Sequence, residues 1–181
     1  MLDRAQYDRF RVSPLDPATL RCEQVEAIVK KLAEESGGRL RVEKFAESVE
    51  GRPIYLATLG AGPRRVLLWS QMHGDEPTHT AVMLDLYHYL LQQPAQPLAA
   101  EILAGCTLMF IPMLNPDGAE AGIRFNAQGI DINRDWRRQV TPEGRSHRFV
   151  GSLSPPRMSC LDTVSSSRSW SAAWHPLLRW P

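Results

Sequence analysis

The chain has 181 residues, of which 43% are hydrophobic and 23% are charged. One domain fits this length and two hardly do, because a domain typically takes roughly 100 to 200 residues. The proportions exclude a disordered chain, a collagen and a coiled coil. With 21 basic and 20 acidic side chains, the net charge of +1 gives the whole chain no electrostatic preference for nucleic acid or anionic membranes. Neither partner is therefore expected.

Neither a membrane span nor an export signal is evident in the sequence. No apolar run approaches the roughly 18 residues that a transmembrane helix needs. Residues 1–10 alternate charged and apolar side chains where a signal peptide has an apolar core. We therefore expect a soluble, cytoplasmic protein. Cys22, Cys106 and Cys160 are far apart and form no Cys-x-x-Cys pair, so neither a zinc knuckle nor a disulfide framework is indicated.

The first third of the sequence predicts one helix followed by two strands. Asp16 opens a pattern of apolar residues at three- and four-residue spacing that stops at Gly37, which predicts one long amphipathic helix. Residues 40–45 alternate apolar and charged side chains, as a half-exposed strand does. Residues 53–59 predict a second strand after a turn at 50–53. These two strands could pair as a hairpin or a meander.

Strands and helices alternate in the middle of the sequence. This order predicts an α/β fold whose functional residues gather in loops at the carboxyl ends of the strands. The two strands are continuously apolar, which is typical of strands covered on both faces. The elements are a strand over 66–69, a helix beginning at Thr78 or Thr80, a short helix over 98–103, and a strand over 106–114 that is closed by a turn at 115–118.

The composition changes from about residue 140 onward. Nine of the thirteen serines and three of the five tryptophans lie in the last 42 residues, which contain no lysine. This stretch shows neither helical nor strand periodicity. We therefore divide the chain into residues 1–144, which carry the patterned elements, and an atypical tail, residues 145–181. The tail is expected to be disordered or to result from a shifted reading frame after Arg145.

The sharpest local signal is His73-Gly74-Asp75-Glu76, which lies between a buried strand and a helix. An imidazole nitrogen and a carboxylate oxygen both bind zinc, at about 2.0 to 2.2 Å, and a tight turn brings two such ligands together. Taken alone the pattern is weak, because about one such chain in three contains His-x-x-Glu by chance. A loop histidine beside a solvated acid is the alternative interpretation.

A second group of polar residues follows the strand over 106–114. The turn Asn115–Gly118 leads into a segment that contains Arg124, Asn133 and Arg134, whose donors could converge on an anion. Arginine grips a carboxylate through two parallel hydrogen bonds, and an arginine near a metal can stabilise an oxyanion. The alternative for this segment is a surface turn with solvated arginines.

Considered together, these motifs resemble the zinc carboxypeptidase family, the carboxypeptidase A-like metallopeptidases. The likeness runs from about Tyr7 to Gly144 and includes the turn and strand Glu50–Ile54. It implies an α/β fold of three layers, with helices on both sides of a mixed, largely parallel sheet, of which this chain is a truncated N-terminal part. The motifs occur in the order His73-Gly-Asp-Glu76, Asn115-Pro-Asp-Gly118, Arg124, Gly129-Ile-Asp-Ile-Asn-Arg134.

The resemblance implies a Zn2+ cofactor and assigns the residues around it. His73 and Glu76 match the first two zinc ligands of the family. Asp131 matches the acid that accepts the other ring N–H of the first ligand, and so orients His73. The implied chemistry is metal-assisted hydrolysis, in which zinc polarises the carbonyl and activates a water while a glutamate base takes the proton.

The resemblance also assigns the substrate-binding residues. Arg124 matches the arginine that polarises the scissile carbonyl and stabilises the oxyanion. Asn133 and Arg134 match the pair that holds the terminal carboxylate and restricts the enzyme to chain ends. The expected partner is therefore a peptide or small amide with a free C-terminal carboxylate, and the expected reaction is the hydrolysis of its last bond. The side-chain preference stays open.

Two residues that the family requires are missing from this sequence. They are a third zinc ligand, a histidine some tens of residues after the Asn-Arg pair, and a later glutamate base. His147 follows Arg134 too closely, and His175 has no strand-like run before it. Glu143 is expected to be a solvated loop acid, as most glutamates are. We therefore expect weak zinc binding and negligible peptidase activity from this chain.

Two other functions stay open at the level of the sequence. One is a zinc deacylase of the related aspartoacylase and succinylglutamate desuccinylase group, which also uses a His-Gly-x-Glu metal motif. The Asn-Pro-Asp-Gly and Gly-x-Asp-x-Asn-Arg motifs favour the peptidase over this reading. The other is a non-catalytic module that binds carboxylates through Arg124, Asn133 and Arg134 without a working metal.

Overall fold

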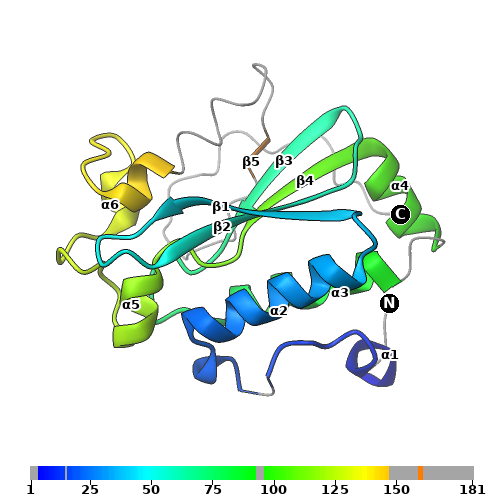
Figure 1. Ribbon diagram of the computed structural model, residues 1–181, viewed down its shortest axis with the longest axis horizontal. Coiled ribbons are helices and arrows are strands. Elements are labelled where there is room, and N and C mark those ends of the chain that lie inside the picture. The colour runs from blue at the N-terminus through cyan, green and yellow to red at the C-terminus, as the bar shows by residue number, and fades with distance from the viewer. Residues whose placement is uncertain (1–3, 15, 93–95, 147–158, 161–181) are drawn as a thin grey trace, which may run out of the picture.

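A mixed sheet is the centre of the computed structural model, which describes residues 4–14, 16–92, 96–146 and 159–160. The strands lie in the spatial order β1-β2-β4-β3-β5 (Figure 1), and their bounds are β1 (Leu40–Glu47), β2 (Pro53–Leu59), β3 (Arg64–Trp69), β4 (Cys106–Ile111) and β5 (Ser159–Cys160). The predicted α/β class with a mixed sheet is confirmed.

The pairing of the strands decides which loops meet. β1 and β2 pair antiparallel, so the residues between them form the connection of a hairpin, one of the two pairings expected. β2 also pairs antiparallel with β4. β3 and β4 run parallel along their whole length, with Trp69 opposite Ile111. Their carboxyl ends therefore lie at the same edge of the sheet, where the loops that follow them come together.

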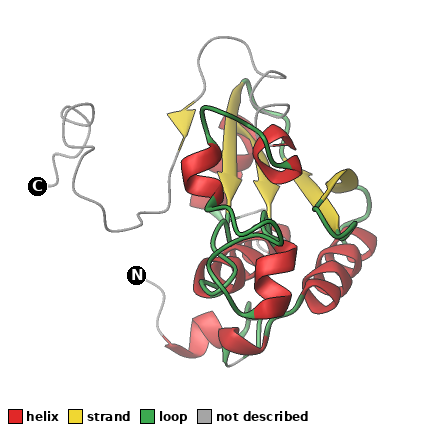
Figure 2. Ribbon diagram, turned by 90° about the vertical axis from the view of Figure 1, so that its left-hand side faces the viewer, coloured by secondary structure: helices red, strands yellow, loops and turns green. Residues whose placement is uncertain are grey.

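The described helices lie along one face of the sheet and at its two ends (Figure 1). α2 and α3 lie side by side along one face of the sheet (Figure 1). α5 and α6 lie at the end where β3 and β4 finish, and Figure 2 looks onto that end. The helix bounds are α1 (Arg4–Asp8), the 3-10 turn η1 (Pro17–Thr19), α2 (Cys22–Glu35), α3 (Thr78–Gln92), α4 (Pro97–Gly105), α5 (Pro116–Ala121) and α6 (Ile132–Asp135).

The long N-terminal helix begins later than its sequence pattern predicts. Asp16 caps only η1, where its carboxylate accepts the Ala18 N–H. Leu20 is extended and 1% exposed, because its side chain turns into the core before the helix begins. α2 starts at Cys22, whose N–H donates to the Glu120 carboxylate at 2.8 Å. Burial of Leu20 and a contact from a distant helix therefore set this boundary.

The segment after β4 also differs from the prediction. The strand ends at Ile111, three residues early, because Pro112 has no N–H to continue a ladder. The expected turn at Asn115 is the start of α5, since the Asn115 side chain accepts the Gly118 N–H as an N-cap and Pro116 occupies the first helical position. The Asn-Pro-Asp-Gly motif is therefore a helix start.

β3 and β4 are covered on both faces, as their continuous apolar sequences predict. Leu68 and Phe110 belong to the larger apolar cluster, which α2 and α3 share. Leu67 and Ile111 point to the opposite face and pack in a second cluster that Ile132 of α6 joins. These two strands are thus fixed from both sides, and so are the loops that leave their carboxyl ends.

Among the described helices, none combines the length and the apolarity needed to cross a bilayer. Residues 142–146 are helical, so the predicted boundary after residue 144 lies within a helical stretch. Of the predicted tail, the structure describes only Arg145, Ser146 and the two residues of β5. Residues 147–158 and 161–181, on which the prediction of disorder mainly falls, lie outside the described residues.

Candidate metal centre

The loop after β3 is held against the loop after β4. Beyond the strands, the Ser70 N–H donates to the Ile111 carbonyl at 3.0 Å, and the Leu114 N–H donates to the Ser70 carbonyl at 3.1 Å. Gly74 lies so close to α5 that a Cβ atom there would be 1.9 Å from the backbone carbon of Gly118. Only glycine fits at this contact, which brings the loop directly against the backbone of α5.

The turn brings His73 and Glu76 together. The Glu76 N–H donates to the His73 carbonyl at 3.2 Å, which closes the turn. His73 is 3% exposed, and its two ring nitrogens face two carboxylates. Nδ1 is 3.1 Å from Glu76 Oε1, and Nε2 is 3.2 Å from Asp131 Oδ1. Because a neutral imidazole has one N–H, it can donate to only one of these two carboxylates.

Asp131 joins the histidine to two other parts of the site. It is the N-cap of α6, where its Oδ1 accepts the Asn133 N–H at 2.9 Å. Its Oδ2 accepts a hydrogen bond from Nε of Arg124 at 3.1 Å and forms an ion pair with Nη2 of the same side chain, also at 3.1 Å. Partial burial tends to raise the pKa of Asp131, but the charge of Arg124 and the hydrogen bond from His73 outweigh it and hold the pKa below its usual value. Asp131 is therefore anionic at neutral pH.

Arg124 reaches this cluster from the loop after α5. Its Nη1 lies 3.6 Å from Glu76 Oε1, so its guanidinium group spans the Glu76 and Asp131 carboxylates. The Arg124 carbonyl accepts the side-chain amide of Asn115 at 3.3 Å, which fixes the backbone beneath the guanidinium group. Four of the six predicted site residues, those from His73 to Asp131, therefore meet at one point.

The other two predicted residues, Asn133 and Arg134, follow in the first turn of α6. Their backbone N–H groups both donate to Asp131. Within the described part of the chain, no hydrogen bond or ion pair joins their side chains to the cluster around His73. The Arg134 side chain instead lines a cavity of about 420 Å³, together with Ile130, Asp135, Arg138 and Val140.

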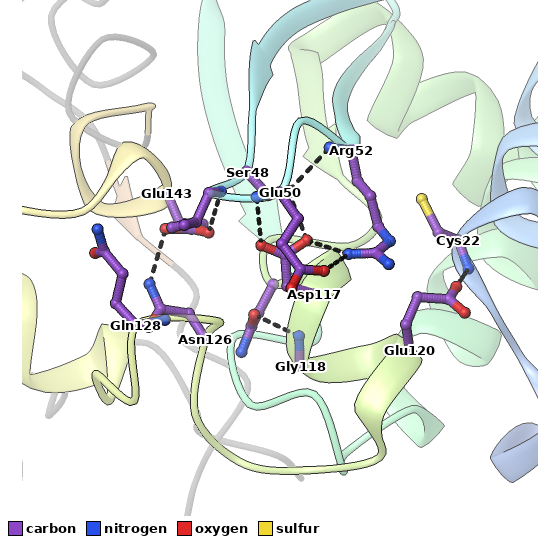
Figure 3. Close-up of polar contacts among 12 residues, drawn as sticks. Cys22, Ser48, Glu50, Arg52, Asp117, Gly118, Glu120, Asn126, Gln128 and Glu143 are labelled. Atoms are coloured by element: carbon purple, nitrogen blue, oxygen red, sulfur yellow. Dashed lines mark hydrogen bonds and ion pairs between the residues drawn. The ribbon is translucent and has the colours of Figure 1, made fainter.

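Glu143 contradicts the prediction of a solvated loop acid. It is 0% exposed, and its carboxylate accepts two hydrogen bonds (Figure 3). The Val49 N–H donates to Oε1 at 3.3 Å, and Nδ2 of Asn126 donates to Oε2 at 3.2 Å. The prediction was wrong because both partners are distant in sequence, and general exposure statistics carry no information about them.

Asp117 is a second buried carboxylate, and the sequence analysis left it without a role. It accepts hydrogen bonds from Ser48 Oγ at 2.7 Å, from the Glu50 N–H at 3.1 Å and from Arg52 Nη1 at 2.7 Å (Figure 3). It therefore fixes the hairpin turn between β1 and β2 onto α5. The sequence offered one signal for this contact. The Glu-Gly-Arg-Pro turn contains Arg52 and the Asn-Pro-Asp-Gly motif contains Asp117, which form an ion pair in the structure.

The chain matches one family model over most of its length. The model of the zinc carboxypeptidases, Peptidase_M14, matches residues 25–153, more than half of the chain. The chain belongs to the zinc carboxypeptidase family. The matched range includes the whole cluster around His73, as well as α6 and Glu143.

Curated carboxypeptidases are similar to this chain over its central part. Carboxypeptidase SOL1 of Arabidopsis thaliana is 28% identical over 127 residues, which cover 66% of this chain and 26% of that protein. The catalytic chain of human carboxypeptidase N is 26% identical over 144 residues, covering 66% and 31%. The chain therefore spans less than a third of the length of these two relatives.

Solved carboxypeptidase structures share the fold. A metallo-carboxypeptidase from Pseudomonas aeruginosa, in complex with (2-guanidinoethylmercapto)succinic acid, has a TM-score of 0.57 at 28% identity, covering 68% of this chain and 35% of that one. Thrombin activatable fibrinolysis inhibitor has a TM-score of 0.72 at 13% identity, covering 86% and 50%. The second likeness concerns the fold alone, and both agree with the α/β architecture.

The donor chemistry of His73 and Glu76 fits a zinc ion. If the N–H of His73 is on Nε2 and donates to Asp131, the lone pair of Nδ1 faces Glu76, and a cation between Nδ1 and the Glu76 carboxylate would satisfy both ligand atoms. No group of three or more His, Cys, Asp and Glu side chains that could hold a metal occurs within the described ranges. His147 and His175 lie outside those ranges. The described residues therefore fit zinc as two ligands.

Proposed function

We propose that this chain is the N-terminal part of a zinc-dependent carboxypeptidase that hydrolyses the peptide bond next to a free C-terminal carboxylate. His73 and Glu76 would hold the metal, and Arg124, Asn133 and Arg134 would bind the substrate. The observation that carries the proposal is the buried His73 ring, whose Nε2 is held by Asp131 while its Nδ1 faces Glu76. Membership of the zinc carboxypeptidase family supports the same reading.

The contacts of Asp131 and Arg124 indicate the role of each in the proposed reaction. Asp131 keeps the imidazole proton on Nε2 and so leaves Nδ1 free to bind a cation. Arg124 places a positive charge beside Glu76, where it can stabilise a carbonyl oxygen that becomes negative. When bound, zinc supplies Lewis acidity and a water of lowered pKa. An oriented metal ligand, a positive charge for the oxyanion and an activated water are together what the hydrolysis of an amide bond requires.

The selection of chain ends would come from α6. Arg134 lines a cavity whose other walls include Ile130 and Val140, so a carboxylate could meet a guanidinium group beside apolar surface. The Pseudomonas aeruginosa relative holds a substituted succinic acid, a ligand with carboxylates, which supports this assignment. The expected substrate class is therefore peptides, or small amides, that end in a free carboxylate.

This chain by itself is expected to bind zinc weakly and to turn over peptide at a negligible rate. Two protein ligands hold zinc far less well than the three that catalytic sites use. Glu143 does not supply the general base from its present position, because it is buried and bonded to Val49 and Asn126. The missing groups would come from a segment beyond the described residues.

The test combines metal binding with hydrolysis. Zinc affinity of the full chain is measured by competition with a chromophoric chelator, in the parent and in His73→Ala. Release of the last residue is followed by mass spectrometry for one peptide with a free C-terminus and for its C-terminal amide. Weak zinc binding that His73→Ala removes, without turnover, is the expected result. Zinc-dependent turnover of the free acid alone would support the family activity but refute the predicted inactivity, and zinc binding unchanged in His73→Ala would refute the site.

A second candidate is a carboxylate-binding module without catalysis. The finding that favours it is that the described residues offer two metal ligands and not three. Such a module binds the free-acid peptide and not its amide, and a chelator such as EDTA leaves the affinity unchanged. A carboxypeptidase site instead loses peptide affinity when the chelator removes the metal. Fluorescence anisotropy of a labelled peptide, with and without chelator, distinguishes the two.

A further inference from the structure

Glu143 is a fully buried carboxylate that has no role in the proposed function. It lies in the helical stretch 142–146 and is 0% exposed. None of the ion pairs found among the described residues involves it. A buried charge is costly unless hydrogen bonds or a partner compensate for it. Its hydrogen bonds should therefore show what it holds in place.

The first of these hydrogen bonds comes from Asn126, whose amide group cannot turn around. Asn126 Oδ1 accepts the N–H groups of Gln128 at 3.0 Å and of Ile130 at 2.9 Å. The side-chain NH2 group must then point the other way, toward Glu143 Oε2 at 3.2 Å. A carboxylate is the acceptor that this fixed donor requires, so the pair has a defined direction.

Asn126 in turn shapes the loop that carries two site residues. Its own N–H donates to the Ile130 carbonyl, and its carbonyl accepts the Gly129 N–H, so residues 126–130 close on the Asn126 side chain and backbone. Arg124 lies just before this closed loop and Asp131 just after it. The separation and direction of Arg124 and Asp131 therefore depend on the conformation that Asn126 imposes.

The second hydrogen bond of Glu143 joins the loop to a rigid part of the fold. The Val49 N–H donates to Oε1 at 3.3 Å, from the hairpin turn between β1 and β2. Asp117 of α5 holds the same turn through Ser48, Glu50 and Arg52 (Figure 3). Glu143 thus connects the 126–130 loop to a turn that is already fixed at the end of the sheet.

We infer that Glu143 is a positioning residue, which ties the 126–130 loop to the β1–β2 turn through Asn126 and so fixes Arg124 and Asp131 against His73. Among the described residues, the hydrogen bonds of Glu143 go to Val49 and Asn126 and none goes to His73 or Glu76. The effect on loop order stands on the contacts alone, whereas the effect on metal affinity also rests on the proposed function.

The test is Glu143→Gln, which changes one oxygen to an NH2 group at constant size. If the amide oxygen of the substituted side chain faces Val49, its NH2 group faces the NH2 group of Asn126. If that oxygen faces Asn126, the NH2 group of the substituted side chain faces the Val49 N–H. One hydrogen bond is lost in either orientation. We expect the amides of Gln128 and Ile130 to exchange with solvent about tenfold faster or more, measured by hydrogen-exchange NMR.

Metal affinity provides a second readout that loss of stability alone does not change. In the same variant, the dissociation constant for zinc is expected to rise roughly 3- to 10-fold, less than for a residue in direct contact with a ligand. If the parent itself binds no zinc, the proposed function fails, but the exchange rates still decide the role of Glu143. If the loop loosens while zinc affinity stays constant, the link from the loop to the metal ligands is refuted.

A reversed pair tests the direction of the hydrogen bond. Asn126→Asp alone places two buried carboxylates face to face and is expected to loosen the loop. Combined with Glu143→Gln, it restores the bond, because the glutamine NH2 group donates to the new carboxylate, whose other oxygen still accepts from Gln128 and Ile130. The double variant should therefore exchange more slowly at these two amides than either single variant does. Additive effects of the two substitutions would refute the pairing.

Asp85→Asn is the matched control, since Asp85 is a buried carboxylate that also accepts several hydrogen bonds. Its partners include the N–H groups of Val12 and Ser13, in the N-terminal segment, and none lies in the site. This variant should expose Val12 and Ser13 to exchange and leave Gln128, Ile130 and the zinc affinity as in the parent. Parent-like exchange in Glu143→Gln, or equal acceleration throughout the chain, would overturn the inference.

Discussion

A single carboxylate, Asp131, contacts a ring nitrogen, a guanidinium group and the start of a helix. Its Oδ1 faces His73 and accepts the Asn133 N–H, while its Oδ2 pairs with Arg124. Replacing it by asparagine removes the charge that holds both the histidine tautomer and the arginine. Partners of this kind typically contribute a factor of 10 to 100 to metal affinity.

Asp131→Asn is therefore expected to weaken zinc binding by roughly 10- to 100-fold, measured by chelator competition at neutral pH. The control is Asp75→Asn, which changes an exposed acid between the two proposed ligands. Its dissociation constant should stay within about a factor of two of the parent value, since the exposed Asp75 carboxylate bonds neither ligand and its charge is screened by water and salt. Equal weakening by the two variants would point to bulk charge and not to the hydrogen bonds of Asp131.

Asp135 makes the stability of the site region depend on pH. It is buried and accepts hydrogen bonds from the Val140 N–H, the Thr141 N–H and Thr141 Oγ1. Burial alone would raise the pKa of Asp135, but these bonds and the charge of Arg145 lower it below its usual value. The folded state thus favours the anion. The stabilisation is present above the ordinary aspartate pKa of about 3.9 and is lost as the pH falls through the lower folded value.

Asp135→Asn should accordingly reduce the free energy of unfolding by about 1.5 to 3 kcal/mol at pH 7, as expected for a hydrogen bond to a charged group. The difference from the parent should begin to shrink below about pH 4, where the unfolded parent binds a proton first, and should level off below the lower folded pKa of Asp135. Urea unfolding at a series of pH values measures this. A difference that is constant from pH 7 to pH 2.5 would show that the charge of Asp135 has no part in it.

At the scale of elements, the site depends on the contact between the loop after β3 and helix α5. The loop can reach α5 only because Gly74 has no side chain, since a Cβ atom there would be 1.9 Å from the backbone carbon of Gly118 and 2.3 Å from the Ala119 nitrogen. Both obstacles are backbone atoms of a helix that Asn115 caps. They cannot yield without shifting α5 itself.

Gly74→Ala is expected to destabilise the fold by about 3 kcal/mol or more, at the upper end of the range for overpacking, and to separate His73 from Asp131. Gly105→Ala is the control, because a Cβ atom at this end of α4 meets nothing within 4 Å. It should be neutral or slightly stabilising. Chemical denaturation compares the two free energies of unfolding, and equal effects would mean that close approach to α5 is not the constraint.

At the scale of the whole molecule, a ligand that binds only the folded chain stabilises it. Zinc at 100 times its dissociation constant should add about 2.7 kcal/mol to the free energy of unfolding. For a chain of this size, that corresponds to a rise in Tm of about 5 to 10 °C. The rise should disappear in His73→Gln and when a chelator is added, as followed by differential scanning fluorimetry.

His88→Gln separates the proposed metal ligand from a histidine that serves the fold. His88 lies on α3, where its Nδ1 bonds the Phe10 carbonyl at 2.8 Å. This variant should lower the Tm without zinc but keep the same rise on adding zinc. A zinc response that vanishes in His88→Gln and persists in His73→Gln would place the metal elsewhere in the molecule.

Much of the fold was predictable because it depends on local patterns. The strands β3 and β4 and the start of α3 at Thr78 were confirmed, although β4 ends at Ile111, since burial on both faces leaves a direct trace in a continuous apolar run. The ordered motifs also predicted the cluster that forms around His73, because the carboxyl ends of parallel neighbouring strands meet at one edge. The roles assigned to these residues stay predictions until metal binding is measured.

Sequence patterns were enough to predict the α/β class, the membership of the zinc carboxypeptidase family and the residues that gather around His73. The folded structure was needed to show that Glu143 is buried, that Asp117 holds the hairpin turn, and that the first long helix begins at Cys22. The physical reason is the same in each case. Hydrophobic periodicity and capping act over a few residues, whereas the burial of a polar side chain depends on hydrogen-bond partners that only the folded chain brings near.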